Sequence, residues 1–153
     1  MKIKKVISTV FFIIMTVSCD RKIDLNLPSV FSDFMILQRE TKVSFWGKSS
    51  PNEKIEIKGT WGKYSSTKAD KSGNWELKLV TPSAGGPYEV VVNDSKNSIV
   101  YKDVLIGEVW LASGQSNMQW KLNQCKDCID NQDEEIENAN YNEIRFFNNP
   151  ADL

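Results

Sequence analysis

The sequence predicts a β-sandwich that is followed by the opening of an α/β/α domain. Between residues 43 and 104, apolar and polar side chains alternate in short segments, and this period of two indicates strands that bury one face. From residue 107 to 112 the apolar run loses its alternation, which is typical of a strand buried on both faces. We therefore expect a β-sandwich domain over 19–106 and an incomplete second domain over 107–153.

Five short segments carry the alternation, and turn residues separate them. Trp75, Leu77 and Leu79 share one face of their segment, so we expect Trp75 to lie in the core. Glycine, proline, asparagine and aspartate cluster between the segments and favour the reversals of an antiparallel sandwich. The segments cover residues 43–46, 54–58, 75–79, 88–92 and 98–101.

The second domain is expected to order its elements as strand, helix, helix, strand. After the first strand, Met118 and Leu122 recur at helical spacing, and a second helix is expected over 130–141. The acidic cluster 133–135 begins that helix, where carboxylates complement the helix dipole, and we favour this interpretation over a calcium site. Residues 144–147 are typical of a second buried strand. Two strands cannot complete a parallel sheet, so we expect the N-terminal piece of a longer protein.

The N-terminus has the features of an export signal. Three lysines precede an apolar run over 6–17, which is shorter than the roughly 20 residues of a membrane-spanning helix. The residues before Cys19 are similar to the bacterial lipoprotein box, although Thr16 stands where such boxes usually carry leucine. We expect residues 1–18 to be a lipoprotein signal peptide and Cys19 to carry a lipid that anchors the protein to a membrane. The alternative is ordinary secretion with a free Cys19, and both predict an exported protein in the periplasm or at the cell surface.

Composition excludes several functional classes. The net charge is −1 and becomes more negative once the basic signal peptide is removed, so no surface for nucleic acid is expected. The chain has no histidine, so a serine nucleophile lacks its ordinary base within these residues. Cys125 and Cys128 predict a disulfide or two free thiols rather than a redox or zinc site, because structural zinc requires four ligands. No metal and no cofactor are expected.

The motif with the clearest chemistry is Ser113-Gly114-Gln115-Ser116-Asn117. It follows the predicted 107–112 strand and precedes a predicted helix, so Ser116 is expected on a sharp turn with its hydroxyl exposed and its backbone N–H free to hold an oxyanion. Gly114 permits the close turn, and Gln115 and Asn117 are expected to shape it, since neutral amides cannot act as bases. The alternative is a polar turn in which Ser116 only caps the helix.

The motif lies within the longer stretch Leu111 to Gln119, and other segments accompany it. Residues 35–39, 46–47, 69–75, 84–88 and 144–147 occur with it in a fixed order. Together, these segments resemble the sialate O-acetylesterase family of the SGNH hydrolase superfamily. Ala112 and Lys121 depart from the family pattern, where many relatives have cysteine and proline.

The resemblance implies a leading β-sandwich, an α/β/α SGNH hydrolase domain of flavodoxin-like type, and hydrolysis of acetyl esters on sugar hydroxyls. It implies that Ser116 is the nucleophile and that its backbone N–H is one oxyanion donor. The histidine that accepts the Ser116 proton and the other oxyanion residues are implied to lie outside these residues. The chain alone is therefore expected to be inactive, and its partner is expected to be an acetylated carbohydrate.

A second interpretation is a lipid-anchored sandwich that binds glycans without catalysis. Among the tryptophans, Trp61 is the one left open as a sugar-stacking residue, because it lies in a turn beside glycines. Trp75 and Trp110 are expected to be buried packing residues. Arg39 is expected to form a surface or interdomain ion pair rather than a substrate clamp.

Overall fold

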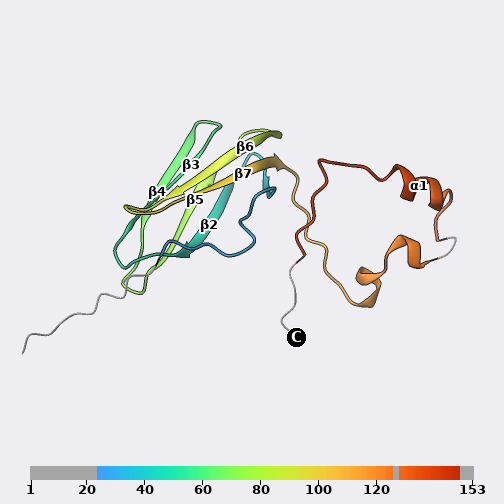
Figure 1. The fold of residues 1–153 in the computed structure, drawn as a ribbon, viewed down its shortest axis with the longest axis horizontal. Coiled ribbons are helices and arrows are strands. Elements are labelled where there is room, and N and C mark those ends of the chain that lie inside the picture. Colours follow the sequence, from blue (N-terminus) through green and yellow to red (C-terminus); the bar gives the residue numbers. More distant parts are fainter. Residues whose placement is uncertain (1–23, 126–127, 149–153) are drawn as a thin grey trace, which may run out of the picture.

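The computed structural model describes residues 24–125 and 128–148, and seven strands dominate it (Figure 1). The predicted signal peptide and Cys19 lie outside the described residues. The strands form a five-stranded sheet in the order β1-β7-β6-β3-β4 and a two-stranded sheet of β2 and β5. Their bounds are β1 Ile36–Gln38, β2 Lys42–Lys48, β3 Lys54–Gly59, β4 Lys63–Lys68, β5 Asn74–Val80, β6 Gly85–Asn93 and β7 Ser98–Gly107.

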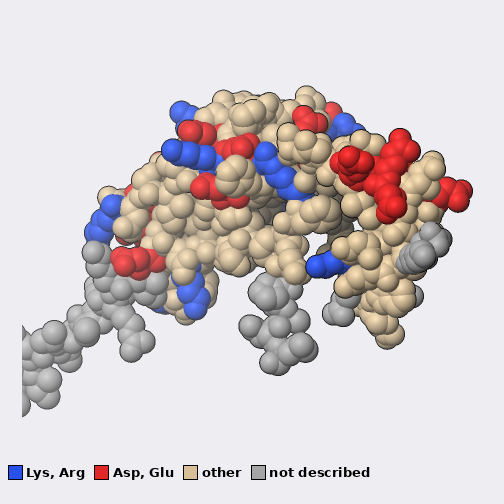
Figure 2. Space-filling model, turned by 45° about the vertical axis from the view of Figure 1, so that its right-hand side comes forward, with Lys and Arg blue, Asp and Glu red and all other residues tan. Residues whose placement is uncertain are grey.

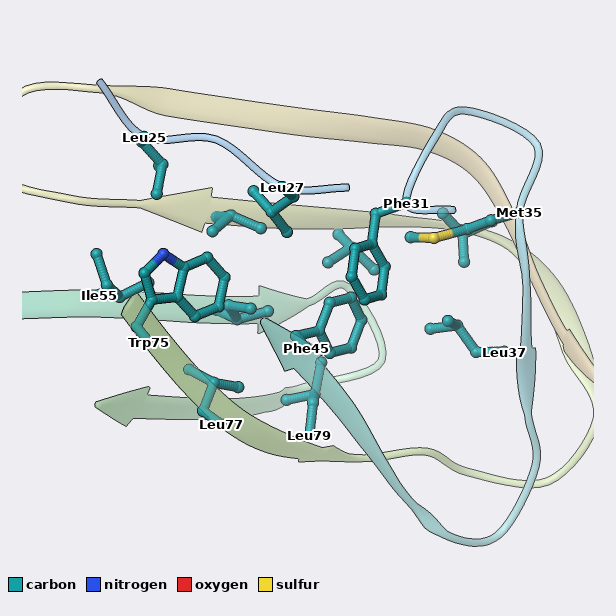
Figure 3. Close-up of a cluster of buried hydrophobic side chains, with 14 of the residues drawn as sticks. Leu25, Leu27, Phe31, Met35, Leu37, Phe45, Ile55, Trp75, Leu77 and Leu79 are labelled. Carbon is teal, nitrogen blue, oxygen red and sulfur yellow. The ribbon is translucent and has the colours of Figure 1, made fainter. Parts of the chain in front are cut away.

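One hydrophobic core lies between the two sheets (Figure 3). The larger sheet contributes Ile57 and Val92, and the smaller sheet contributes Phe45 and Leu79, all with no exposed surface. The predicted alternation of β3 and β5 is confirmed, since every second residue of each strand is buried. Trp75 is 4% exposed, which confirms its predicted place in the core. Burial of this apolar area supplies the main driving force for folding.

Two strands were not predicted, and one of them changes the topology. β1 pairs with β7 in parallel, with Ile36 opposite Leu105, so the larger sheet is not wholly antiparallel as expected. β4 pairs with β3, although its residues lack the apolar alternation of a half-buried strand. β7 also extends further than the predicted 98–101, because it gains β1 as a second neighbour.

The predicted strand over 107–112 is wrong. β7 ends at Gly107, where its pairing with β1 also ends, and the next described elements are short helices. Trp110 is 87% exposed and Leu111 is 95% exposed, so the prediction that Trp110 is buried is wrong too. A strand buried on both faces needs neighbouring strands and covering layers, and the described residues after Gly107 supply neither.

The remaining elements are helical and short. They are the 3₁₀ helices η1, Ser116–Gln119, and η2, Leu122–Gln124, and the α-helix α1, Gln132–Asn138. The predicted strand over 144–147 is wrong, since no strand forms there and Phe146 is 93% exposed. The described residues after Gly107 therefore do not form the expected α/β/α arrangement. Within the described part of the chain, no helix is long and apolar enough to cross a membrane.

The acidic cluster at the start of α1 is exposed. Asp133, Glu134 and Glu135 occupy the first turn of α1, where the helix dipole favours negative charge. Figure 2 shows acidic side chains gathered at the end of the molecule that carries this helix. Among the described residues, no group of histidine, cysteine, aspartate and glutamate side chains is arranged to hold a metal ion.

Candidate active site

Ser116 lies at an abrupt change of backbone direction. Gln115 is extended, with φ −94° and ψ −152°, and Ser116 begins η1. The backbone N–H of Met118 donates to the carbonyl of Gln115 at 2.9 Å, which closes the turn. Ser116 is exposed, but it lies well beyond the end of β7 rather than directly at the end of a strand as expected.

Gly114 permits this turn through its lack of a side chain. A Cβ atom at Gly114 would lie 2.5 Å from the Cγ of Met118, far inside van der Waals contact. A side chain at residue 114 would therefore displace the Met118 side chain from this position. Gln115 contributes through its backbone carbonyl and makes no side-chain cap, while Asn117 is the second residue of η1.

The turn presents the Ser116 hydroxyl without activating it. Among the described residues, no hydrogen bond joins that hydroxyl to a side chain that could accept its proton. The sequence has no histidine to supply an imidazole. A serine hydroxyl needs an adjacent base to become a good nucleophile, so this geometry orients the group and leaves its activation to another residue.

The segment that follows Ser116 is braced by Gln132, a residue that the sequence did not single out. The Gln132 amide accepts from the Cys128 backbone N–H at 3.2 Å and donates to the Leu122 carbonyl at 3.0 Å, which ties α1 to η2. Cys125 and Cys128 form a disulfide with their Cα atoms 5.6 Å apart. These links give the residues after Ser116 a local framework.

Arg145 connects the residues after Ser116 to β7 of the larger sheet. Its guanidinium donates to both the backbone carbonyl and the carboxylate of Asp103, the latter at 2.8 Å, and it lies 5.7 Å from the ring centre of Phe34. Asp103, which accepts through both oxygens, has a left-handed backbone, with φ 52°. The planar fork of arginine matches such paired acceptors. This contact has no local sequence signature, because 42 residues separate its partners.

A second contact holds the residues just after β7. The Glu108 carboxylate accepts from Gln38 at 2.9 Å and from Arg39 at 2.6 Å. These hydrogen bonds, with that of Gln38 the larger influence, lower the pKa of Glu108. Arg39 is thus a surface ion-pair residue, as predicted. The amide oxygen of Gln38 also accepts from the Val109 backbone N–H at 2.9 Å, which directs the chain as it leaves the sheet.

Trp61 is a packing residue rather than an open sugar platform. Its indole N–H donates to the carbonyl of Val80 at 2.8 Å, and its ring meets Tyr88 edge to face at 5.4 Å. The ring lies over Gly59, where a Cβ would approach it to 2.4 Å. Both the polar tip and the ring of Trp61 are therefore already occupied by protein contacts.

Comparison with known proteins places these features in a family. No family model matches the chain. The sialate O-acetylesterase of Mus musculus is 32% identical over 93% of this chain, and that of Homo sapiens is 33% identical over 81%. These matches cover 28% and 25% of the relatives, so the chain spans about a quarter of their length.

A solved structure of another acetylesterase is also similar to this chain. The crystal structure of a carbohydrate acetylesterase from Xanthomonas citri superposes with a TM-score of 0.63 at 41% identity, over 68% of this chain and 24% of that protein. Sequence and fold thus agree on one group of proteins over most of the chain. The chain belongs to the sialate O-acetylesterase family.

Proposed function

We propose that this chain provides the nucleophile of a carbohydrate O-acetylesterase, which hydrolyses acetyl esters on sugar hydroxyls. The observation that carries the proposal is the exposed Ser116 at the turn into η1, in a chain whose relatives are named as acetylesterases. An exposed hydroxyl on a tight turn is the arrangement that serine hydrolases use to reach an ester.

In the proposed reaction, the Ser116 oxygen attacks the acetyl carbonyl carbon and gives up its proton to a base. The carbon–oxygen bond to the sugar then breaks, the sugar alcohol takes that proton, and an acetyl-serine remains. Water attacks the acetyl-serine, which releases acetate and restores the hydroxyl. The base is supplied by polypeptide outside the printed sequence, since these residues contain no histidine.

The backbone N–H of Ser116 is one donor to the oxyanion of this reaction. η1 has only four residues and so supplies no appreciable helix dipole, and the proposal relies on a single directed N–H. The remaining hydrogen-bond donors to the oxyanion, like the base, are supplied by residues outside this chain. We assign residues 107–153 to the incomplete SGNH domain, whose remaining polypeptide covers apolar side chains such as Leu111 and Phe146, now 95% and 93% exposed.

The test is acetate release by the longest gene product that contains this chain, measured on a panel of acetylated oligosaccharides. Ser116→Ala should lower kcat/KM by at least about a thousandfold, because the nucleophile is removed. Ser113→Ala is the matched control, since it deletes another exposed hydroxyl from the same turn and should leave kcat/KM unchanged. Full activity in Ser116→Ala would contradict Ser116 as the nucleophile, whereas no acetate release by the unchanged protein would favour the alternative of a non-catalytic glycan-binding module.

The proposal includes export and a lipid anchor at Cys19, which places the enzyme where acetylated glycans reach the cell. A bacterial host that expresses the gene should incorporate labelled fatty acid into the protein and retain it in the membrane fraction. Cys19→Ser should abolish both the label and the membrane retention. Labelling that persists in Cys19→Ser would contradict this assignment.

A further inference from the structure

A groove of about 620 Å³ opens where the N-terminal segment crosses the end of the two-stranded sheet. Residues 26–28 form one wall, residues 46–48 of β2 form the floor, and residues 74–76 of β5 with Asp70 form the other wall. Its volume lies within the range of about 300–1,000 Å³ that small-molecule sites occupy. Ser116 and the residues of its turn do not line this groove.

Gly47 brings the first wall close to the floor. Asn26 and Lys48 exchange two backbone hydrogen bonds, of 2.9 and 2.8 Å, across the edge of β2. A Cβ at Gly47 would lie 2.1 Å from the Asn26 carbonyl oxygen and 2.9 Å from the Trp75 ring. The absence of this side chain therefore sets the spacing between the segment and the sheet.

An indole and polar groups share the solvent face of this sheet. Trp46 is 44% exposed, and Phe31 supports it from the core side in an edge contact of 4.8 Å. In the β2–β5 register, Trp46 lies opposite Glu76, and Lys48 lies opposite Asn74. All four side chains alternate with inward-facing residues, so they point to the same exposed face.

The polar wall is held in place before any ligand arrives. The Asp70 carboxylate accepts from the backbone N–H groups of Asn74 at 2.9 Å and Ser72 at 2.7 Å. The first of these bonds is the largest influence that lowers the Asp70 pKa, so the carboxylate stays ionised and fixes the turn. Asp70 also accepts from the Asn74 side-chain amide at 3.4 Å, which links these two residues that line the groove.

A buried donor of the second wall, the Trp75 indole N–H, has no protein partner among the described residues. Trp75 is 4% exposed, and its Nε1 has no hydrogen-bond partner among the described residues. Figure 3 shows this nitrogen turned toward the N-terminal segment that carries Leu25 and Leu27. Trp75 points to the core side of the sheet and Trp46 to the solvent face, so this N–H is not among the groups that a ligand over Trp46 would reach.

We propose that the groove binds an uncharged pyranose residue of the glycan on which the enzyme acts, with the sugar ring over Trp46. The apolar C–H face of a pyranose suits the indole face, while its hydroxyls suit amide and carboxylate partners such as Asn74 and Glu76. Two carboxylates, Asp70 and Glu76, outweigh the single ammonium of Lys48, which disfavours acidic sugars. The ligand class rests on the proposed function, while the groove itself is independent of Ser116.

Other exposed tryptophans do not offer the same combination. Trp110 and Trp120 are 87% and 62% exposed, but neither lines the groove. A stacking ring needs polar groups beside it to fix the ligand's orientation, and in the described part of the chain Trp46 has them. Trp46 therefore replaces Trp61 as the sugar-stacking candidate.

The test is a titration of the purified chain with neutral xylo- and cello-oligosaccharides, followed by backbone amide NMR shifts. Shifts should concentrate at residues 26–27, 46–48 and 74–76, and sialyllactose, which is acidic, should bind at least about tenfold more weakly. Trp46→Ala should weaken neutral-sugar binding by about tenfold or more. Trp120→Ala is the matched control and should bind as the unchanged chain does, because it also removes an exposed indole.

Two further measurements separate a loss of sugar binding from a loss of folding and from a loss of catalysis. Glu76→Ala removes an exposed side chain that does not support the core. It should also weaken sugar binding, while its amide NMR spectrum remains that of a folded protein. In the complete gene product, Trp46→Ala should raise KM for an acetylated oligosaccharide more than it lowers kcat. Binding by Trp46→Ala equal to that of the unchanged chain would overturn the groove proposal even if acetate release continues. Groove binding with no acetate release would overturn only the esterase.

Discussion

Residues 24–107 bury a hydrophobic core, whereas the described large apolar side chains of residues 108–148 are exposed. In the described chain, every buried hydrophobic residue lies between Leu25 and Ile106, whereas residues such as Leu111 and Phe146 are almost fully exposed. Both regions contain large apolar residues, so the difference lies in what covers each apolar surface. Two sheets cover one another in the first region, and the second region has no opposing layer among the described residues.

The largest expected effect comes from exchanging one phenylalanine in each region for alanine. Phe45 is fully buried and stacks on Phe31 at 4.8 Å, so Phe45→Ala should lower the free energy of unfolding by about 3–5 kcal/mol. Phe146→Ala should change it by less than about 0.5 kcal/mol, because the side chain is 93% exposed. Urea denaturation followed by tryptophan fluorescence measures both values. Equal losses in the two variants would show that the regions form one core.

The next effect tests whether the N-terminal segment belongs to the first region. Gly47→Ala should lower the free energy of unfolding by about 1–3 kcal/mol, because the new Cβ must displace the Asn26 carbonyl or the Trp75 ring. Gly107→Ala is the matched control, since its nearest neighbour would be an Ile36 methyl group at 4.0 Å. Thermal unfolding by circular dichroism compares the two. Equal melting temperatures would mean that residues 25–28 can leave the sheet at no cost.

Much of the first region could be predicted because the pattern of apolar and polar residues within each strand indicates which side chains are buried. Period-two alternation identified β3 and β5, since each buries one face against the same core. β4 escaped prediction because residues such as Ser65 and Thr67 carry no apolar signal, and the strand forms through its pairing with β3. Register and pairing are properties of two segments, and a single segment does not encode them.

The second region was mispredicted for the complementary reason. The apolar run at Val109–Leu111 does resemble a buried strand, but burial requires neighbours that the described residues do not provide. The position of Ser116 on a turn followed from its short motif, because Gly114 and the reversal act within a few residues. The Arg145–Asp103 contact could not follow from any motif, because it depends on a distant partner with a left-handed backbone.

A smaller effect should sharpen the boundary between the regions. Arg145→Ala removes the pair of hydrogen bonds that holds residues 144–147 against Asp103 and should speed amide hydrogen exchange in that segment by about tenfold. Exchange within β6 and β7 should stay unchanged, since the core is not altered. Arg145→Lys should recover little protection, because an ammonium lacks the planar fork. Unchanged exchange in Arg145→Ala would show that other contacts position the segment.

The smallest expected effect is a pH dependence of the free energy of unfolding, and it arises from Asp94 in the first region. Partial burial opposes the charge of Asp94, but hydrogen bonds from Asn97 and Lys96 outweigh it, so the Asp94 pKa lies below its ordinary value of 3.8. A carboxylate with a lowered folded pKa stabilises the protein fully above its ordinary pKa, and this contribution is lost as pH falls through the folded value. Asp94→Asn should therefore be less stable near neutrality, by about 1 kcal/mol, and should differ little from the unchanged chain in strong acid.

Urea midpoints measured from neutral pH to about pH 2 give this difference directly, because Asp70 and the other carboxylates titrate in both proteins and cancel. Asp94 also accepts from the buried Ser49 hydroxyl at 3.1 Å, which links the β6–β7 turn to the loop after β2. The pH-dependent difference should consequently persist in Phe146→Ala and Arg145→Ala, whose changes lie in the second region. If the stability difference between the two proteins grew as pH falls, the pKa of Asp94 in the folded protein would be raised rather than lowered. If the stability difference between the unchanged chain and Asp94→Asn vanished when Arg145 is replaced, charges in the second region would influence Asp94 through the Arg145–Asp103 contact.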